Sequence, residues 1–150
     1  MKNSTSRMIV ALFVLSLVAA WPALAQSVTV LAKAEIPFSF VVGQKTLPAG
    51  EYEIRPGNKV NKDTLWIKKT DSSAAASVIT FGQSGKRKQT GPYLVFNRYG
   101  SQYFLSQVWP EFDQFGRQTP KTAAERELIQ AGSPKMAGTW PEVVLLSARK

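Results

Sequence analysis

Apolar and polar residues alternate in short stretches along most of this chain, and turn-forming residues separate the stretches. Between positions 28 and 36, apolar side chains occupy every second position, which is the period of a strand with one buried face. Residues 43–45 and 47–50 then supply the glycine and proline that tight turns require. Many short alternating segments bury their apolar faces by packing sheet on sheet or by closing one sheet on itself. The pattern predicts a mainly β protein.

The strongest local prediction is a β-hairpin late in the chain. Residues 93–98 and 102–109 are dense in aromatic and aliphatic side chains, and the turn residues 99–101 separate them. Because both faces of the two arms are largely apolar, we expect this hairpin in the middle of the sheet system. Other strands are expected at 38–42, 52–55, 64–70, 77–81 and 142–148, with a polar loop at 82–91.

The segment 119–131 changes to the period of a helix. Thr122 and Glu125 have the spacing of a capping box, which satisfies free backbone N–H groups at a helix start. The apolar face of this helix is predicted to consist of Ala124, Leu128 and Ala131. Taken together, the segments predict an antiparallel β-sandwich or a small β-barrel of about seven to eight short strands, with one helix near the C-terminus.

The first 25 residues have the order of a cleavable signal peptide. A polar stretch with Lys2 and Arg7 precedes the apolar run 9–21, and the small-x-small sequence of residues 23–25 follows. Cleavage is expected between Ala25 and Gln26. A membrane-spanning helix needs about 20 apolar residues, and this run is shorter. We therefore expect 1–25 to be removed and 26–150 to form a single secreted β-domain, periplasmic or extracellular, without a membrane span.

The residue types that the chain lacks exclude several chemistries. It contains no cysteine and no histidine, so it cannot form a Ser-His-Asp triad, a Cys-His pair or a zinc site of the usual ligands. We expect no catalytic residue, no cofactor and no metal. Removal of the leader lowers the net charge from +9 to +7 because Lys2 and Arg7 leave with it. A basic protein adsorbs to anionic surfaces, and export argues against nucleic acid as its partner.

Five sequence motifs of the mature chain occur together in a known group of proteins. They are IPFSFVVG at 36–43, TLPAGEY at 46–52, FNRYG at 96–100, FLSQVW at 104–109 and AEREL at 124–128. This combination resembles a group of uncharacterised secreted proteins of acidobacteria and related soil bacteria. The resemblance covers most of the mature chain and implies export and a bacterial source. The group has no assigned activity, substrate or catalytic residue, so the resemblance implies no function.

A basic loop is the first candidate for ligand binding. Lys86, Arg87 and Lys88 lie between glycines and could hold the phosphate or sulfate groups of an envelope polymer, joined by Lys68 and Lys69. The simpler interpretation is a solvated loop that keeps the protein in solution.

The aromatic residues of the hairpin are the second candidate. They could line a cavity for a lipid or stack on sugar rings, although aromatic residues at strand spacing usually form a core. Arg98 is a charge on a mostly apolar arm, so it must lie at the end of the arm, form a pair or face a ligand. The aromatic set is Tyr93, Phe96, Tyr99, Tyr103, Phe104 and Trp109.

Three functions remain open at the level of sequence. The first is a non-enzymatic binding or envelope-associated module for an anionic polymer or glycan, with Lys86–Lys88, Arg98, Tyr99 and Trp109 as candidate ligand-binding residues. The second is a lipocalin-like carrier of a small apolar ligand. The third is a glycan hydrolase that uses two carboxylates. Its candidate pairs are Glu51 with Glu53 and Glu111 with Asp113, and the latter pair is also a weak candidate for calcium.

Overall fold

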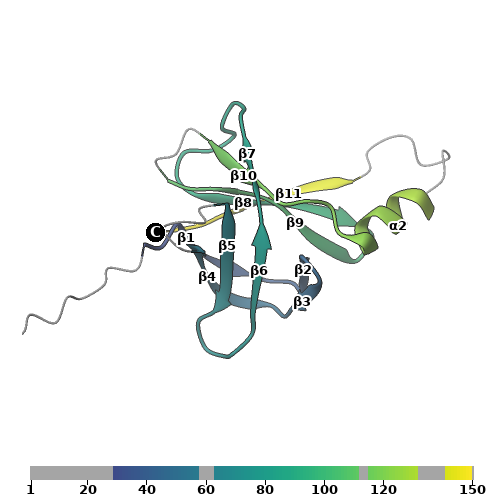
Figure 1. The fold of residues 1–150 in the computed structure, drawn as a ribbon, viewed down its shortest axis with the longest axis horizontal. Coiled ribbons are helices and arrows are strands. Elements are labelled where there is room, and N and C mark those ends of the chain that lie inside the picture. The colour runs from purple at the N-terminus through teal and green to yellow at the C-terminus, as the bar shows by residue number, and fades with distance from the viewer. Residues whose placement is uncertain (1–28, 58–62, 112–114, 132–140, 150) are drawn as a thin grey trace, which may run out of the picture.

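The fold is a mainly β structure of two sheets, as the alternating sequence predicts (Figure 1). The computed structural model describes residues 29–57, 63–111, 115–131 and 141–149. Within these residues there are eleven strands and one helix near the C-terminus. The sandwich-like arrangement is therefore confirmed, with more strands than the seven or eight expected, because several three-residue strands were not recognisable in the sequence.

The smaller sheet has four antiparallel strands in the order β1-β4-β5-β6. Its strands follow the predicted period of two: in β5, Leu65 and Ile67 are buried, whereas the alternate residues Trp66 and Lys68 are exposed. One face thus belongs to the core and the other faces outward. The strands are β1 (Ala32–Ile36), β4 (Gly50–Pro56), β5 (Thr64–Lys69) and β6 (Ala75–Ile79).

The larger sheet is built around the predicted hairpin. Its main path runs β11-β8-β9-β10-β7, and Gly100, with a φ of 62°, makes the turn between β8 and β9. The far edge of β9 is shared, since β2 pairs parallel with its first half and β10 antiparallel with its second half. These strands are β2 (Phe40–Val42), β3 (Lys45–Leu47), β7 (Phe81–Gln83), β8 (Tyr93–Tyr99), β9 (Gln102–Trp109), β10 (Gly116–Gln118) and β11 (Glu142–Ser147).

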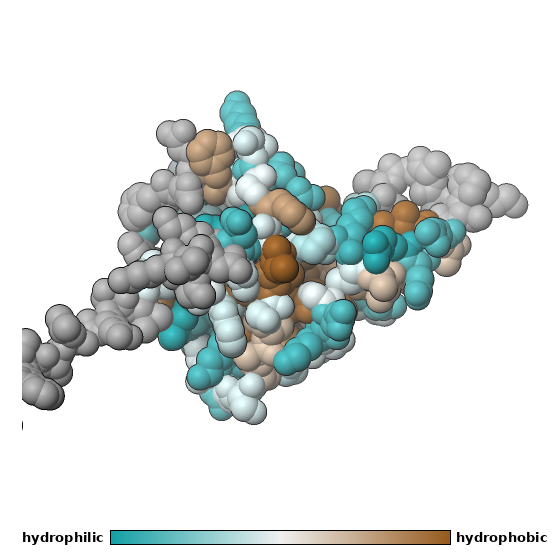
Figure 2. Space-filling model, viewed as in Figure 1, coloured by the Kyte–Doolittle hydropathy of each residue, from teal (hydrophilic) through white to brown (hydrophobic). Residues whose placement is uncertain are grey.

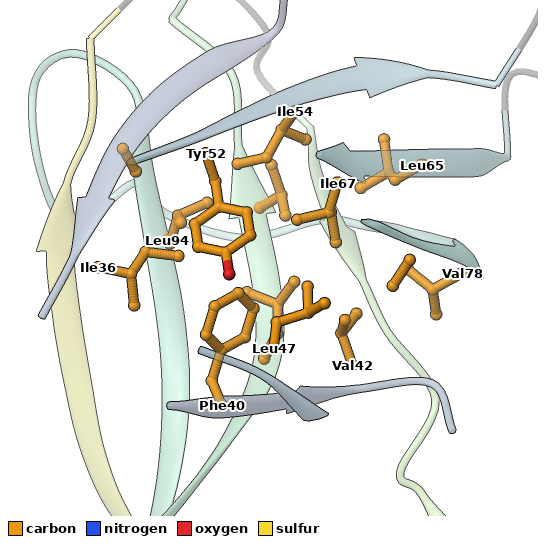
Figure 3. Close-up of a cluster of buried hydrophobic side chains, with 14 of the residues drawn as sticks. Ile36, Phe40, Val42, Leu47, Tyr52, Ile54, Leu65, Ile67, Val78 and Leu94 are labelled. Atoms are coloured by element: carbon orange, nitrogen blue, oxygen red, sulfur yellow. The ribbon is translucent and has the colours of Figure 1, made fainter. Parts of the chain in front are cut away.

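The main hydrophobic core lies between the two sheets. Figure 3 shows side chains from both sheets, and from the β2–β3 hairpin, pointing into one space. Tyr52 is fully buried there, and its hydroxyl donates to the carbonyl of Pro48 in the predicted turn. Burying one large apolar side chain contributes roughly 1.5 to 3 kcal/mol, so this core supplies much of the stability. Its labelled members are Ile36, Phe40, Val42, Leu47, Tyr52, Ile54, Leu65, Ile67, Val78 and Leu94.

Between β6 and β7 the chain passes from the smaller to the larger sheet through a single residue. Thr80 is buried between β6 and β7, and both its backbone N–H and its Oγ1 donate to the carbonyl of Asp63, at 2.6 and 2.7 Å. The predicted strand 77–81 is thus two strands in different sheets, which is how strands turn a corner in packed sheets. The predicted polar loop 82–91 also begins too early, because Gly82 and Gln83 belong to β7.

The helix α2 (Ala123–Ala131) begins later than the predicted segment 119–131 and keeps only Leu128 of the predicted apolar face. Glu125 is buried and Leu128 half-buried, whereas Ala124 and Ala131 are exposed. Thr122 Oγ1 accepts from the backbone N–H of Glu125 at 3.0 Å, as in a capping box, but the Glu125 carboxylate turns to the sheet. Within the described residues, no helix is long and apolar enough to cross a bilayer.

Candidate functional site

The basic loop is fastened to the sheet by its central residue. The Arg87 guanidinium donates through Nη1 to the carbonyl of Pro110 at 2.6 Å and through Nη2 to that of Gly91. Its Cζ lies 5.8 Å from the centre of the Tyr93 ring, a cation–π geometry. Arg87 is therefore used to hold the loop against the ends of β8 and β9, which the sequence did not indicate.

The two lysines of this loop are exposed, and the aromatic residue predicted beside them is not. Lys86 and Lys88 face outward, and the backbone N–H of Lys88 donates to the Tyr93 hydroxyl at 3.0 Å. Trp109 is only 3% exposed, stacks on Tyr93 with centroids 5.6 Å apart, and donates through Nε1 to Gln107. Its ring therefore offers no open surface on which a sugar could stack.

Arg98 and Tyr99 lie at the opposite end of β8. Arg98 pairs through Nη1 with Glu142 at 3.1 Å and lies over the Tyr103 ring, so it sits at the end of its arm and forms a pair. Tyr99 is buried and donates to Glu125 Oε1 at 3.1 Å. Burial and the Glu125 carboxylate raise the pKa of Tyr99 to about 12. Since a strand rises about 3.3 Å per residue, roughly 20 Å separates the two groups of candidates, which do not form one site.

The six hairpin aromatics pack mainly on one another and on the core. Phe96 meets Phe40 edge to face, with centroids 5.5 Å apart, and Tyr99 meets Phe104 in the same way. Tyr103 is half-buried and stacks on Phe38 at 3.8 Å. These contacts match the core interpretation of the aromatic set. The carrier hypothesis is not tested by them and stays a prediction.

The carboxylates expected on one strand face are there, and each is paired with a cation. Glu53 binds Lys33 at 2.7 Å and also binds Arg55. The hydrogen bonds from Lys33 and then Arg55 hold the pKa of Glu53 below its usual range. Glu51 binds Arg149. These ion pairs fix both side chains on the outer face of β4.

The second carboxylate pair is only partly visible. Glu111 is half-buried, and Asp113 lies outside the described residues, so the hydrolase and calcium hypotheses for this pair stay predictions. Among the residues that are described, no three of His, Cys, Asp and Glu gather in a way that could hold a metal ion.

A residue that sequence reasoning did not single out places an open aromatic surface on the smaller sheet. Trp66 on β5 is 51% exposed, and it stands on the outer face of the smaller sheet. Its cross-strand neighbours are Arg55 on β4 and Ser77 on β6. The signal was available, because Trp66 occupies the polar parity of an alternating strand, where a large aromatic side chain cannot be core.

The side chains around Trp66 form two adjacent rows across the smaller sheet. One row is Arg55, Trp66 and Ser77, and the next is Lys33, Glu53 and Lys68. Side chains on one sheet face lie about 5 Å apart across strands, so one ligand can touch both rows. Arg55 Nε is buried and has no hydrogen-bond partner among the described atoms. We call this surface the Trp66 face: Lys33, Glu53, Arg55, Trp66, Lys68 and Ser77.

Lys68 and Lys69, which the sequence analysis grouped as one addition to the basic loop, lie on opposite faces of β5. Lys68 belongs to the Trp66 face, whereas Lys69 follows the inward parity of β5 and is half-buried. Its Nζ pairs with Asp71 at 3.1 Å, and its stem fills the space where Gly50 would carry a Cβ. Of these two lysines, Lys68 is therefore the one that a ligand on the outer face can reach.

More apolar surface adjoins the Trp66 face at the corner between the sheets. Figure 2 shows hydrophobic side chains reaching the surface over β6 and beside the start of β7. Ile79 and Phe81, on either side of the buried Thr80, are both largely exposed. Ile79 lies one position diagonal to Trp66, since Ser77 pairs with Trp66.

Comparison of the chain with protein-family models, curated proteins and solved structures finds no match. The assignment of a site therefore depends on geometry and chemistry alone. On the Trp66 face, an indole ring lies between a guanidinium, an ammonium group and a hydroxyl. Such an indole can stack on the apolar face of a ligand ring, while the polar groups around it bind the substituents of that ligand ring.

Proposed function

We propose that this protein is an exported, non-enzymatic binding module for acidic polysaccharide, and that the Trp66 face holds the sugar chain. The observation that carries the proposal is the half-exposed indole of Trp66 on a paired, rigid strand, with Arg55 directly across from it. A rigid aromatic ring costs little conformational entropy when it binds, and a fixed sheet keeps its neighbours in register.

The charges of the Trp66 face favour a sugar that carries carboxylate or sulfate groups. Arg55 and Lys68 flank Trp66 on neighbouring positions, and the N–H groups of a guanidinium or an ammonium group donate charge-assisted hydrogen bonds to carboxylate and sulfate oxygens. Glu53 is held ionised by Lys33 and Arg55, so it can accept hydrogen bonds from sugar hydroxyls. The excess of basic residues in the whole chain adds long-range attraction for a polyanion.

The expected location agrees with such a ligand. The leader 1–25 predicts export, and the polymers outside a bacterial cytoplasm include acidic polysaccharides. Residues 1–28 lie outside the described part, so the cleavage between Ala25 and Gln26 stays a prediction. The basic loop at Lys86–Lys88 lies on the other sheet and is not needed for this function.

Titration calorimetry with polygalacturonate, an acidic polymer, and dextran, a neutral one, tests the proposal. We expect binding to polygalacturonate that weakens as salt is added, and weaker or no binding to dextran. Trp66→Ala should reduce the affinity about tenfold or more, since the stacking of a nucleobase on an aromatic side chain, a contact of similar area, is worth about 1 to 3 kcal/mol.

Phe115→Ala is the matched control, because it removes another largely exposed aromatic residue, which directly precedes β10 of the larger sheet. It should leave the affinity unchanged. Absence of binding to the acidic polymer, or equal losses in the two variants with unchanged thermal stability, would overturn the proposal.

A further inference from the structure

β11 forms one edge of the larger sheet, and its backbone is incompletely paired. On one side it pairs with β8 along its whole length, from Glu142 opposite Arg98 to Ser147 opposite Tyr93. On its other side, the only described residue that pairs with this segment is Lys33, which bridges to Arg149 just after the strand. Unpaired N–H and C=O groups on an edge strand are a template for another strand.

The hydrogen bonds at the end of β11 show which backbone groups point outward. The N–H of Ala148 donates to Pro92 at the start of β8, whereas the N–H and C=O of Arg149 both bond to Lys33 on the far side. Because direction alternates along a strand, the odd-numbered residues Val143, Leu145 and Ser147 also turn their N–H and C=O groups away from β8.

This edge lacks the features that prevent strands from pairing with other molecules. Residues 143–146 are Val-Val-Leu-Leu, which favour strands, and the stretch contains no lysine and no proline. Its pairing with β8 is regular and has no bulge. The Val143 side chain is 49% exposed, so it is open to contact with another molecule.

We infer that β11 pairs antiparallel with β11 of a second copy, around a two-fold axis at Leu145. In this register Leu145 faces Leu145 of the partner subunit, and Val143 faces Ser147 of the partner subunit. Every outward N–H and C=O of these three residues then meets an opposite group, because hydrogen-bonded pairs in antiparallel strands exchange both bonds. The two larger sheets become one continuous sheet with closed symmetry.

A second copy fits this edge because the strand is self-complementary in length and side chains. On the core face, Val144 lies opposite Leu146 of the partner subunit, so apolar side chains meet across the axis. β11 begins at Glu142, one residue after the position that would face Arg149 of the partner subunit, so the ladder between the copies can end before the Lys33–Arg149 bridge. The free stretch therefore ends where the partner's strand ends.

Sedimentation and light scattering of the mature chain across a range of concentrations test this inference. We expect twice the monomer mass at the higher concentrations, and Val143→Pro should shift the equilibrium to monomer, because it removes an outward N–H at an edge position that tolerates proline. Val143→Thr, which keeps that N–H, is the matched control and should remain dimeric.

Amide hydrogen exchange distinguishes this interface from any other. In the dimer the amides of Val143, Leu145 and Ser147 should be protected, and in the proline variant Leu145 and Ser147 should lose protection while Val144 and Leu146 keep theirs. A monomer at every concentration would overturn the inference. A dimer whose odd-numbered amides exchange freely would do the same.

Discussion

A single buried carboxylate attaches the helix to the sheet. Glu125 is 3% exposed, and its Oε1 accepts from Asn97 Nδ2 at 2.9 Å and from the Tyr99 hydroxyl at 3.1 Å. It also lies in the first turn of α2, where the helix dipole favours negative charge. Most other side chains of the helix are exposed, so this polar contact, and the half-buried Leu128, hold α2 in place.

Replacing this carboxylate should destabilise the fold. In Glu125→Ala, the half-buried Asn97 amide and the buried Tyr99 hydroxyl lose their common acceptor, and we expect a loss of about 2 kcal/mol in the free energy of unfolding. Urea titration followed by circular dichroism measures it. Glu127→Ala removes an exposed carboxylate from the same helix and should change stability by less than about 0.5 kcal/mol. Equal losses in both variants would contradict the anchoring role.

The same contact predicts how stability depends on alkaline pH. The pKa of Tyr99 is about 12 in the folded chain and near its ordinary value of 10.0 in the unfolded chain. Between these values the folded state keeps the proton and the unfolded state loses it, so the free energy of unfolding falls as the pH rises. Tyr99→Phe has no such proton, and its stability should fall less between pH 10 and 12. Urea titrations at neutral and alkaline pH measure both slopes, and identical slopes would refute the assignment.

At the scale of the element, local pattern and long-range pairing contributed differently to what could be predicted. The alternation of β5 and the apolar β8–β9 hairpin are written in consecutive residues, and both predictions are confirmed. The three-residue strands β3, β7 and β10 could not be predicted in this way. Pairing with neighbouring strands, and not their own composition, holds these residues in an extended conformation. The change of sheet at Thr80 could not be predicted for the same reason, because it depends on a hydrogen bond to the carbonyl of Asp63, a residue distant in sequence.

In the candidate site, too, local features could be predicted from the sequence, whereas contacts between distant segments could not. The outward parity of Trp66 could be read from β5 alone, but its position beside Arg55 and Ser77 needs the register of three strands. For Arg87, the sequence predicts only a charge in a polar loop. Its acceptors include the carbonyl of Pro110, 23 residues away, and no local pattern reveals such a contact.

The short strand β10 offers a test of packing on the outer face of the larger sheet. A Cβ at Gly116 would lie 2.5 Å from Cε2 of the Trp109 ring, so Gly116→Ala must displace a ring that is stacked on Tyr93. Overpacking of this kind costs typically 1 to 3 kcal/mol, and we expect about 2 kcal/mol. Thermal and urea unfolding provide the measurement.

Gly82→Ala provides the matched control for this substitution. Gly82 lies on the neighbouring strand β7 and pairs with Arg117 of β10, and a Cβ at Gly82 would meet nothing within 4 Å. Its stability should change by less than about 0.5 kcal/mol. If both alanine variants lose stability equally, the close approach of Trp109 to Gly116 is not what requires the glycine.

At the scale of the whole molecule, the two ends of the described chain meet on β1. The first described backbone hydrogen bond runs from the N–H of Leu31 to Ile54, and Lys33 then bridges to Arg149. Ala32, Ala34 and Ile36 all point into the core between the sheets. β1 therefore closes the smaller sheet and links it to the C-terminal end of β11.

This arrangement predicts where the chain can be shortened. A protein that starts at Gln26 keeps every described contact and should unfold cooperatively with strong β-sheet circular dichroism. A protein that starts at Phe38 loses β1, exposes the edge of β4 and leaves the core without Ile36, so it should show no cooperative transition, since a domain of this size has only about 5 to 15 kcal/mol of stability. Cooperative unfolding of the shorter protein at the same temperature would show that the two sheets do not depend on β1.

The mass of the exported native protein should match a chain that starts at Gln26, and a heavier product that retains the apolar run would refute the predicted cleavage.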